Sequence, residues 1–120
     1  MQSFRKLQVW EKSLIVAQEI YASTAAFPDR ERFGLTGQLR RAVVSIGANI
    51  AEGTGRRSSA DFARFLFMAM GSANEVESCL ELAARLGFLS QAAHDRISIR
   101  IIEIKKMIVS QIRRLQTANS

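Results

Sequence analysis

The sequence has few of the residues that break helices. Among its 120 residues there is one proline, Pro28, and there are seven glycines. Because proline and glycine most often end helices and strands, so few of them predict few and long elements. The single cysteine, Cys79, cannot form a disulfide within the chain. It lies in an apolar helical pattern, so we expect a small buried hydrophobic side chain in a reducing cytoplasm.

The sequence also lacks the features of membrane-spanning and secreted chains. No uncharged apolar run reaches the roughly 18 residues that a membrane helix needs. The first residues lead into an amphipathic pattern rather than into the apolar core of a signal peptide. A composition of 48% hydrophobic and 23% charged residues is typical of a globular protein. We therefore expect one cytoplasmic domain that covers residues 1–120.

Motifs of enzyme active sites are missing as well. His94 is the only histidine and has no partner motif, so we expect a surface residue. Glu75, Glu77 and Glu81 fall within two turns, but the Glu-x-x-His pattern of di-iron bundles is absent. Residues 53–55 lack the Lys-Ser/Thr of a phosphate-binding loop, and no nucleophile motif supports a Ser-His-Asp assembly. These absences predict a non-enzymatic protein without a metal ion or a cofactor.

Apolar residues recur at steps of three and four throughout the chain, which predicts helices and no strands. The expected helices cover residues 3–26, a segment that begins between 29 and 36 and ends at 52, residues 58 or 59 to 87, and residues 91–115. Short connections between them predict an all-α, antiparallel, up-down-up-down four-helix bundle.

Residues at the helix ends support these boundaries. Gly53 and Gly87 are expected to end the second and third helices. Ser58 with Asp61 resembles a capping box at the start of the third helix. Gly71 costs stability inside a helix, so we expect it to pack closely against another backbone.

Several of the expected helices carry more apolar surface than a lone bundle needs, which is one stripe per helix. The first helix has a heptad-like seam, Leu7, Trp10, Leu14, Ala17 and Tyr21, beside a second line, Val9, Val16, Ile20 and Phe27. The third helix has a seam at Phe62, Leu66, Ala69, Ala73, Val76, Leu80 and Ala83, and the fourth has one at Ile97, Ile101, Ile104, Ile108, Ile112 and Leu115. Surplus apolar surface at helical spacing is typical of a subunit interface, so we predict a homo-oligomer.

The second expected helix has a polar ladder beside its apolar stripe. The ladder consists of Gln38, Arg41, Ser45, Asn49 and Glu52. It is either a solvated face or a partly buried polar network in which Arg41 pairs with Glu75 of the next helix. A third side, at Gly47, Ala48 and Ala51, has little bulk, so another helix could approach it closely.

Positive charge is the main indication of a partner. The chain has 17 Lys and Arg against 11 Asp and Glu, a formal charge of +6, and most of the 17 are arginine, which suits phosphate recognition. The candidate nucleic-acid-binding residues are Arg40, Arg56, Arg57, Arg64, Lys105, Lys106, Arg113 and Arg114. The alternative is that they form ordinary solvated helix faces, some paired with acids. Because Phe62 and Phe65 belong to the packing pattern, we expect binding mostly to the backbone of RNA or DNA.

Several segments together resemble one family. They are residues 4–10 (FRKLQVW), 27–28 (FP), 33–35 (FGL), 38–46 (QLRRAVVSI), 49–53 (NIAEG), 61–66 (DFARFL) and 69–72 (AMGS), with Glu31 and Glu75. The chain resembles the four-helix-bundle proteins of the 23S rRNA intervening-sequence family. It departs from them at Gly47, where members often carry proline.

The resemblance implies an antiparallel four-helix bundle and association into a ring of five chains. It also implies similarity to the accessory proteins of diversity-generating retroelements, which are basic rings that bind nucleic acid and a reverse transcriptase. The expected function is therefore that of an oligomeric nucleic-acid-binding accessory protein. The alternative is a structural oligomer or a protein-interaction adaptor without a nucleic-acid role.

Overall fold

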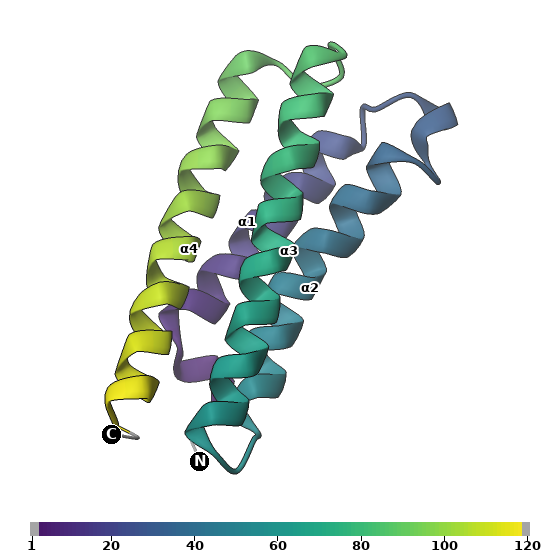
Figure 1. The fold of residues 1–120 in the computed structure, drawn as a ribbon. Coiled ribbons are helices and arrows are strands. Elements are labelled where there is room, and N and C mark those ends of the chain that lie inside the picture. Colours follow the sequence, from purple (N-terminus) through teal and green to yellow (C-terminus); the bar gives the residue numbers. More distant parts are fainter. Residues whose placement is uncertain (1–2, 119–120) are drawn as a thin grey trace.

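The computed structural model describes residues 3–118 and confirms the predicted all-α fold. Its four long helices are α1 (Gln8–Thr24), α2 (Leu35–Thr54), α3 (Ser59–Arg85) and α4 (Gln91–Ala118). Short 3₁₀ helices, η1 (Phe4–Lys6) and η2 (Asp29–Glu31), precede α1 and α2. The helices run up, down, up and down, so both ends of the chain lie near the α2–α3 connection (Figure 1).

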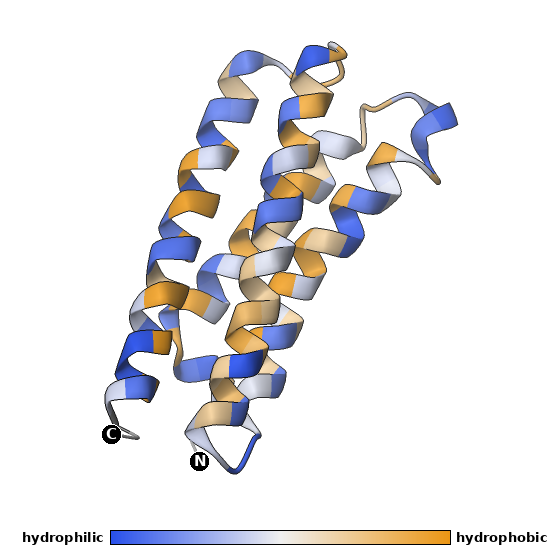
Figure 2. Ribbon diagram, viewed as in Figure 1, coloured by the Kyte–Doolittle hydropathy of each residue, from blue (hydrophilic) through white to orange (hydrophobic). Residues whose placement is uncertain are grey.

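Each of the four helices has two neighbouring helices in the bundle. α1 lies beside α2 and α4, and α3 lies beside the same two helices, whereas the backbones of the diagonal pairs do not approach each other closely within residues 3–118. The outer face formed by α1 and α2 therefore lies on the opposite side of the bundle from the face formed by α3 and α4. Figure 2 shows apolar residues along the helices between polar ones, as an amphipathic bundle requires.

The core confirms the predicted stripes of the third and fourth helices. In α3 the seam from Leu66 to Ala83 is buried and Phe62 is half-buried. In α4 the five isoleucines of the stripe are buried, and Leu115 is half-buried. Because large aliphatic side chains recur at these spacings on one side of each helix, that side is the one expected to face the core.

The core of α1 differs from the predicted seam. Val9, Val16 and Ile20 are buried, whereas Leu14 and Tyr21 of the seam are exposed. The buried line also includes Ser13 and Thr24, whose hydroxyl groups donate to carbonyl oxygens of their own helix, at 2.6 Å for Trp10 and 2.7 Å for Ile20. Because these local hydrogen bonds satisfy the two hydroxyls, small polar residues can occupy the core.

Several predicted helix boundaries need correction. The first helix is interrupted at Leu7, which has an extended backbone with φ −84° and ψ 122°, and it ends at Thr24. Gly53 does not end α2, which continues to Thr54 with Gly55 as its cap. The fourth helix was predicted to end at residue 115, but α4 continues to Ala118. The predictions for the two ends of α3 are confirmed, since the Ser58 hydroxyl accepts from the Asp61 N–H at 3.0 Å and Gly87 has φ 81° beyond the end of α3.

The close helix contacts lie at other glycines than the predicted Gly71. That residue is exposed on α3, and a Cβ added there would meet nothing within 4 Å, so the prediction of close packing is wrong. Gly47 does face a close neighbour, because an added Cβ would lie 2.6 Å from the Ser13 hydroxyl oxygen. At Gly53 an added Cβ would lie 2.8 Å from Cδ1 of Phe62 and 3.1 Å from Cβ of Phe65. The α2 helix therefore meets α1 and α3 at small residues.

Candidate nucleic-acid interface

The positive charge of the chain is concentrated in one half of the bundle. Residues 3–12, 48–70 and 105–118 form the half that carries both chain ends and the α2–α3 connection, and we call it the basic half (Figure 1). It contains ten Lys and Arg and three Asp and Glu. The opposite half, residues 13–47 and 71–104, contains seven Lys and Arg and eight Asp and Glu. The net charge of the chain therefore comes from the basic half alone.

Three of the predicted cations are paired with acids. Arg56 contacts Glu52 at 3.1 Å, Arg64 contacts Asp61 at 2.9 Å, and Lys105 donates to Glu77 at 2.5 Å. The guanidinium groups of Arg56 and Arg64 also lie over the ring of Phe65, at 4.3 and 4.6 Å from its centroid. These contacts fix the side chains, but they reduce the charge that is available to a ligand.

Four other predicted cations have no acidic partner among residues 3–118, and all are exposed: Arg57, Lys106, Arg113 and Arg114. Arg114 donates to Ser110 and Gln111 of its own helix, so its guanidinium is held without being neutralised. All four belong to the basic half.

Arg40 lies apart from the other seven predicted cations. It is half-buried in the opposite half, where its Nε donates to the Thr24 hydroxyl at 2.9 Å. Its guanidinium also lies 4.6 Å from the ring centroid of Tyr21. These contacts join α2 to α1, which is a packing role.

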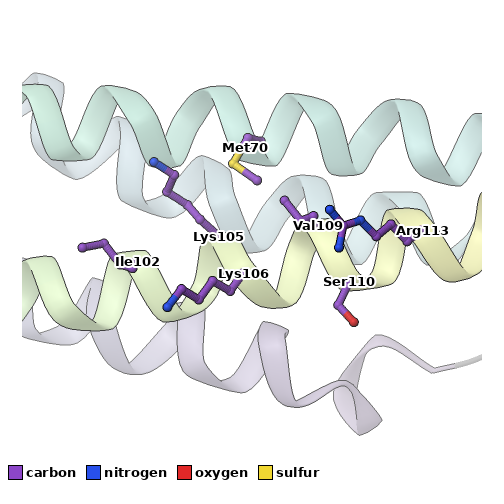
Figure 3. A pocket seen from close by; sticks show the side chains of 7 residues that line it. All are labelled: Met70, Ile102, Lys105, Lys106, Val109, Ser110 and Arg113. Atoms are coloured by element: carbon purple, nitrogen blue, oxygen red, sulfur yellow. The ribbon is translucent and has the colours of Figure 1, made fainter.

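A groove between α3 and α4 brings cations and apolar side chains together. Its volume is about 520 Å³, and its lining residues are Met70, Ile102, Lys105, Lys106, Val109, Ser110 and Arg113. Figure 3 shows Met70 projecting from α3 above Val109 of α4, with the Arg113 guanidinium close to Val109. The groove thus has an apolar floor with positive charge beside it.

A second hollow, of about 460 Å³, lies on the same α3–α4 face toward the chain ends. Ser59, Ala60, Ala63, Arg64, Phe67, Leu115 and Gln116 line it. Phe67 is 56% exposed there, and sequence reasoning did not single it out. The signal was available, because Phe67 falls outside the seam from Phe62 to Ala83 that is expected to face the core.

The polar ladder of α2 is partly a network and partly a solvated face. The Asn49 amide donates to the carbonyl and hydroxyl oxygens of Ser45 at 2.9 and 3.0 Å, and the Ser72 hydroxyl of α3 donates to the Ser45 hydroxyl at 2.9 Å. Glu52 instead pairs with Arg56. Arg41 and Glu75 are both exposed, and within the described chain no ion pair joins them.

Groups with potential for catalysis are scattered. His94 is half-buried beside Asp95, with 3.0 Å between Nδ1 and Oδ1, and this hydrogen bond lowers the pKa of Asp95. Cys79 is buried, as predicted, and burial together with the nearby Glu75 charge raises the pKa of its thiol. Residues 3–118 contain no group of three or more His, Cys, Asp or Glu that could hold a metal ion. In the same residues, no helix has the length and apolarity to cross a membrane.

The fold and the surface define a small antiparallel four-helix bundle with a basic half. The chain belongs to the 23S rRNA-intervening sequence protein family, because the family model matches residues 5–110. It is similar to the crystal structure of a protein of unknown function from the S23 ribosomal protein family of Bacteroides thetaiotaomicron. The two chains are 34% identical with a TM-score of 0.78, over 87% of this chain and 97% of the other. A search of the curated proteins found no match.

Proposed function

We propose that this chain is a non-enzymatic, cytoplasmic, homo-oligomeric protein that binds the backbone of RNA or DNA through its basic half. The observation that carries the proposal is the separation of charge, with ten cations against three acids in one half of the bundle. Phosphate binding needs several cations on one surface, because each neutralised phosphate releases counterions. Arg57, Lys106, Arg113 and Arg114 supply cations that no acid of the described chain neutralises.

Self-association would multiply this surface. Val44 of α2 is 49% exposed on the α1–α2 face, where an apolar hollow is also lined by Leu14, Ala48 and Ala51 and by no charged residue. Burying this hollow against a second copy requires none of its lining residues to bring a charge out of water, unlike the α3–α4 face with its free cations. We therefore propose the α1–α2 face as a contact between copies, in a ring of five as the family resemblance implies.

Binding of labelled RNA and DNA, followed by fluorescence anisotropy, tests the nucleic-acid proposal. Contact with four phosphates predicts that the affinity falls about 50- to 150-fold between about 50 and 200 mM salt. Absence of binding to either nucleic acid at the lower salt concentration would refute the proposal.

The uncharged hollow on the α1–α2 face favours a second candidate function, a structural oligomer or protein-interaction adaptor. An oligomer that binds neither RNA nor DNA at low salt would support this alternative. The similarity to accessory proteins of diversity-generating retroelements belongs to the proposal as well, and it adds a reverse transcriptase to the protein partners that we propose to test.

A further inference from the structure

The α3–α4 face presents an aromatic ring beside free cations. Phe67 is 56% exposed and shares its hollow with Arg64 and Leu115. The groove that contains Lys106 and Arg113 lies further along the same face. One surface of the basic half therefore offers an exposed aromatic face, an aliphatic floor and positive charge.

Phe67 differs from the other phenylalanines of the basic half. Phe4 packs edge to face against Trp10, with 4.8 Å between ring centroids, and Phe65 is covered by two guanidinium groups. Phe62 is half-buried against the core. Within the described chain the ring of Phe67 has no aromatic or cationic group stacked on it. Its face is therefore available to a ligand.

The chemistry of this face distinguishes between forms of nucleic acid. A duplex presents phosphates outward and hides the faces of its bases, so it would leave the Phe67 ring and the groove floor uncovered. A single strand exposes both phosphates and base faces, and bases stack on aromatic side chains while cations hold the backbone. We infer that the α3–α4 face binds single-stranded RNA or DNA, with a base stacked on Phe67 and phosphates near Lys106 and Arg113. This inference rests on the proposed function and specifies its ligand.

The test compares Phe67→Leu with Phe33→Leu. Leucine keeps the size and apolarity needed against Leu115 but removes the aromatic face. Phe33 is a matched control because it is 86% exposed beside Arg32, but it lies in the opposite half. Anisotropy with a single-stranded oligonucleotide and with its duplex, at one low salt concentration, gives the affinities.

We expect the wild-type chain to bind the single strand more tightly than the duplex. Phe67→Leu should weaken single-strand binding about tenfold and leave duplex binding unchanged, because stacking on one aromatic ring accounts for roughly such a factor. Phe33→Leu should change neither affinity.

Two results would overturn the inference. Equal affinities of the wild-type chain for both forms, with no effect of Phe67→Leu, would leave backbone binding intact but remove the single-strand site. A change of oligomeric mass in Phe67→Leu, measured by light scattering, would show that Phe67 contacts a second copy instead. Failure of the wild-type chain to bind either form would refute the proposed function itself, so the two failures are distinguishable.

Discussion

At the scale of single residues, identical amino acids have different roles according to the helix face on which they lie. Gly53 and Gly71 both lie within helices, but Gly53 is buried against Phe62 and Phe65 while Gly71 faces open space. The sequence pattern predicted close packing at Gly71 and a helix end at Gly53. The face that a small residue occupies depends on how neighbouring helices are rotated, and this rotation is a property of the packed bundle.

The two glycines give a pair of opposite predictions. Gly53→Ala should lower the free energy of unfolding by about 1–3 kcal/mol, because the added methyl group overpacks the α2–α3 contact. Gly71→Ala should raise it by up to about 1 kcal/mol, since alanine favours helix and meets no neighbour there. Urea unfolding followed by circular dichroism measures both. A stabilised Gly53→Ala chain would contradict the close contact.

The ion pair of Lys12 and Glu103 predicts a pH dependence. Lys12 Nζ lies 2.7 Å from Glu103 Oε1, and this hydrogen bond together with the lysine charge lowers the pKa of Glu103 below its ordinary value of 4.5. A carboxyl group whose pKa is lowered by folding stabilises the chain above the ordinary pKa, and this contribution is lost as the pH falls through the folded value.

We therefore expect Glu103→Gln to be less stable than the wild type near neutral pH, and the difference to vanish well below pH 4.5. Urea unfolding at about pH 7 and about pH 3 would show this. A difference of the same size at both pH values would mean that the ion pair is not its source.

At the scale of elements, the sequence predicted the inward faces of α3 and α4 better than that of α1. In α4 the buried residues Ile97, Ile101 and Ile104 belong to a single stripe of isoleucines, so the inward face is easy to recognise. In α1 two apolar lines compete, and the core selects the one that includes Ser13. Ser13 of α1 faces the core because it packs against Gly47 of α2. The pattern of residue types within α1 alone cannot predict this contact between two helices.

The α1–α4 pair depends on a charged contact that periodicity does not show. Glu19 of α1 contacts both Arg96 and Arg100 of α4, with 3.3 Å between Oε2 and the Arg96 Nε. Glu19→Ala should lower the free energy of unfolding by about 1 kcal/mol, the upper range for a partly exposed pair. Glu81→Ala is the control and should have nearly no effect, because Glu81 is exposed and pairs with Arg85 of its own helix at 3.5 Å. Its contact with α4 is long, with 4.0 Å between Oε1 and the His94 Nε2. Equal effects on thermal unfolding would argue against a special role for Glu19.

At the scale of the whole molecule, the charge separation emerges from the fold. The cations of the basic half come from three segments that are distant in the sequence, residues 3–12, 48–70 and 105–118, and only the antiparallel topology brings them together (Figure 1). The overall charge could be predicted from the sequence, but the placement of seven of the eight candidate cations in one half of the bundle could not. The packing role of Arg40 could not be predicted either, because it depends on the contact between α2 and α1. The exposure of Phe67 could have been predicted, because Phe67 falls outside the seam that faces the core.

The α1–α2 face yields a prediction about assembly. Val44→Glu would place a charge at the centre of the proposed contact between copies, so it should lower the mass measured by light scattering while the helical circular dichroism stays unchanged. Ala92→Glu, at an exposed position in the first turn of α4, should leave the mass unaltered. A wild-type chain that is monomeric at micromolar concentration would contradict the proposed oligomer.

The most direct test of the charge-separation proposal compares two variants of identical net charge. One replaces Arg57, Lys106, Arg113 and Arg114 of the basic half with glutamine, and the other replaces Arg30, Arg32, Arg41 and Arg85 of the opposite half. If location matters, the first variant should lose most of its affinity for RNA and DNA and much of its salt dependence, while the second should bind like the wild type. Equal losses in both variants would show that binding follows net charge alone, and would contradict a nucleic-acid interface on the basic half.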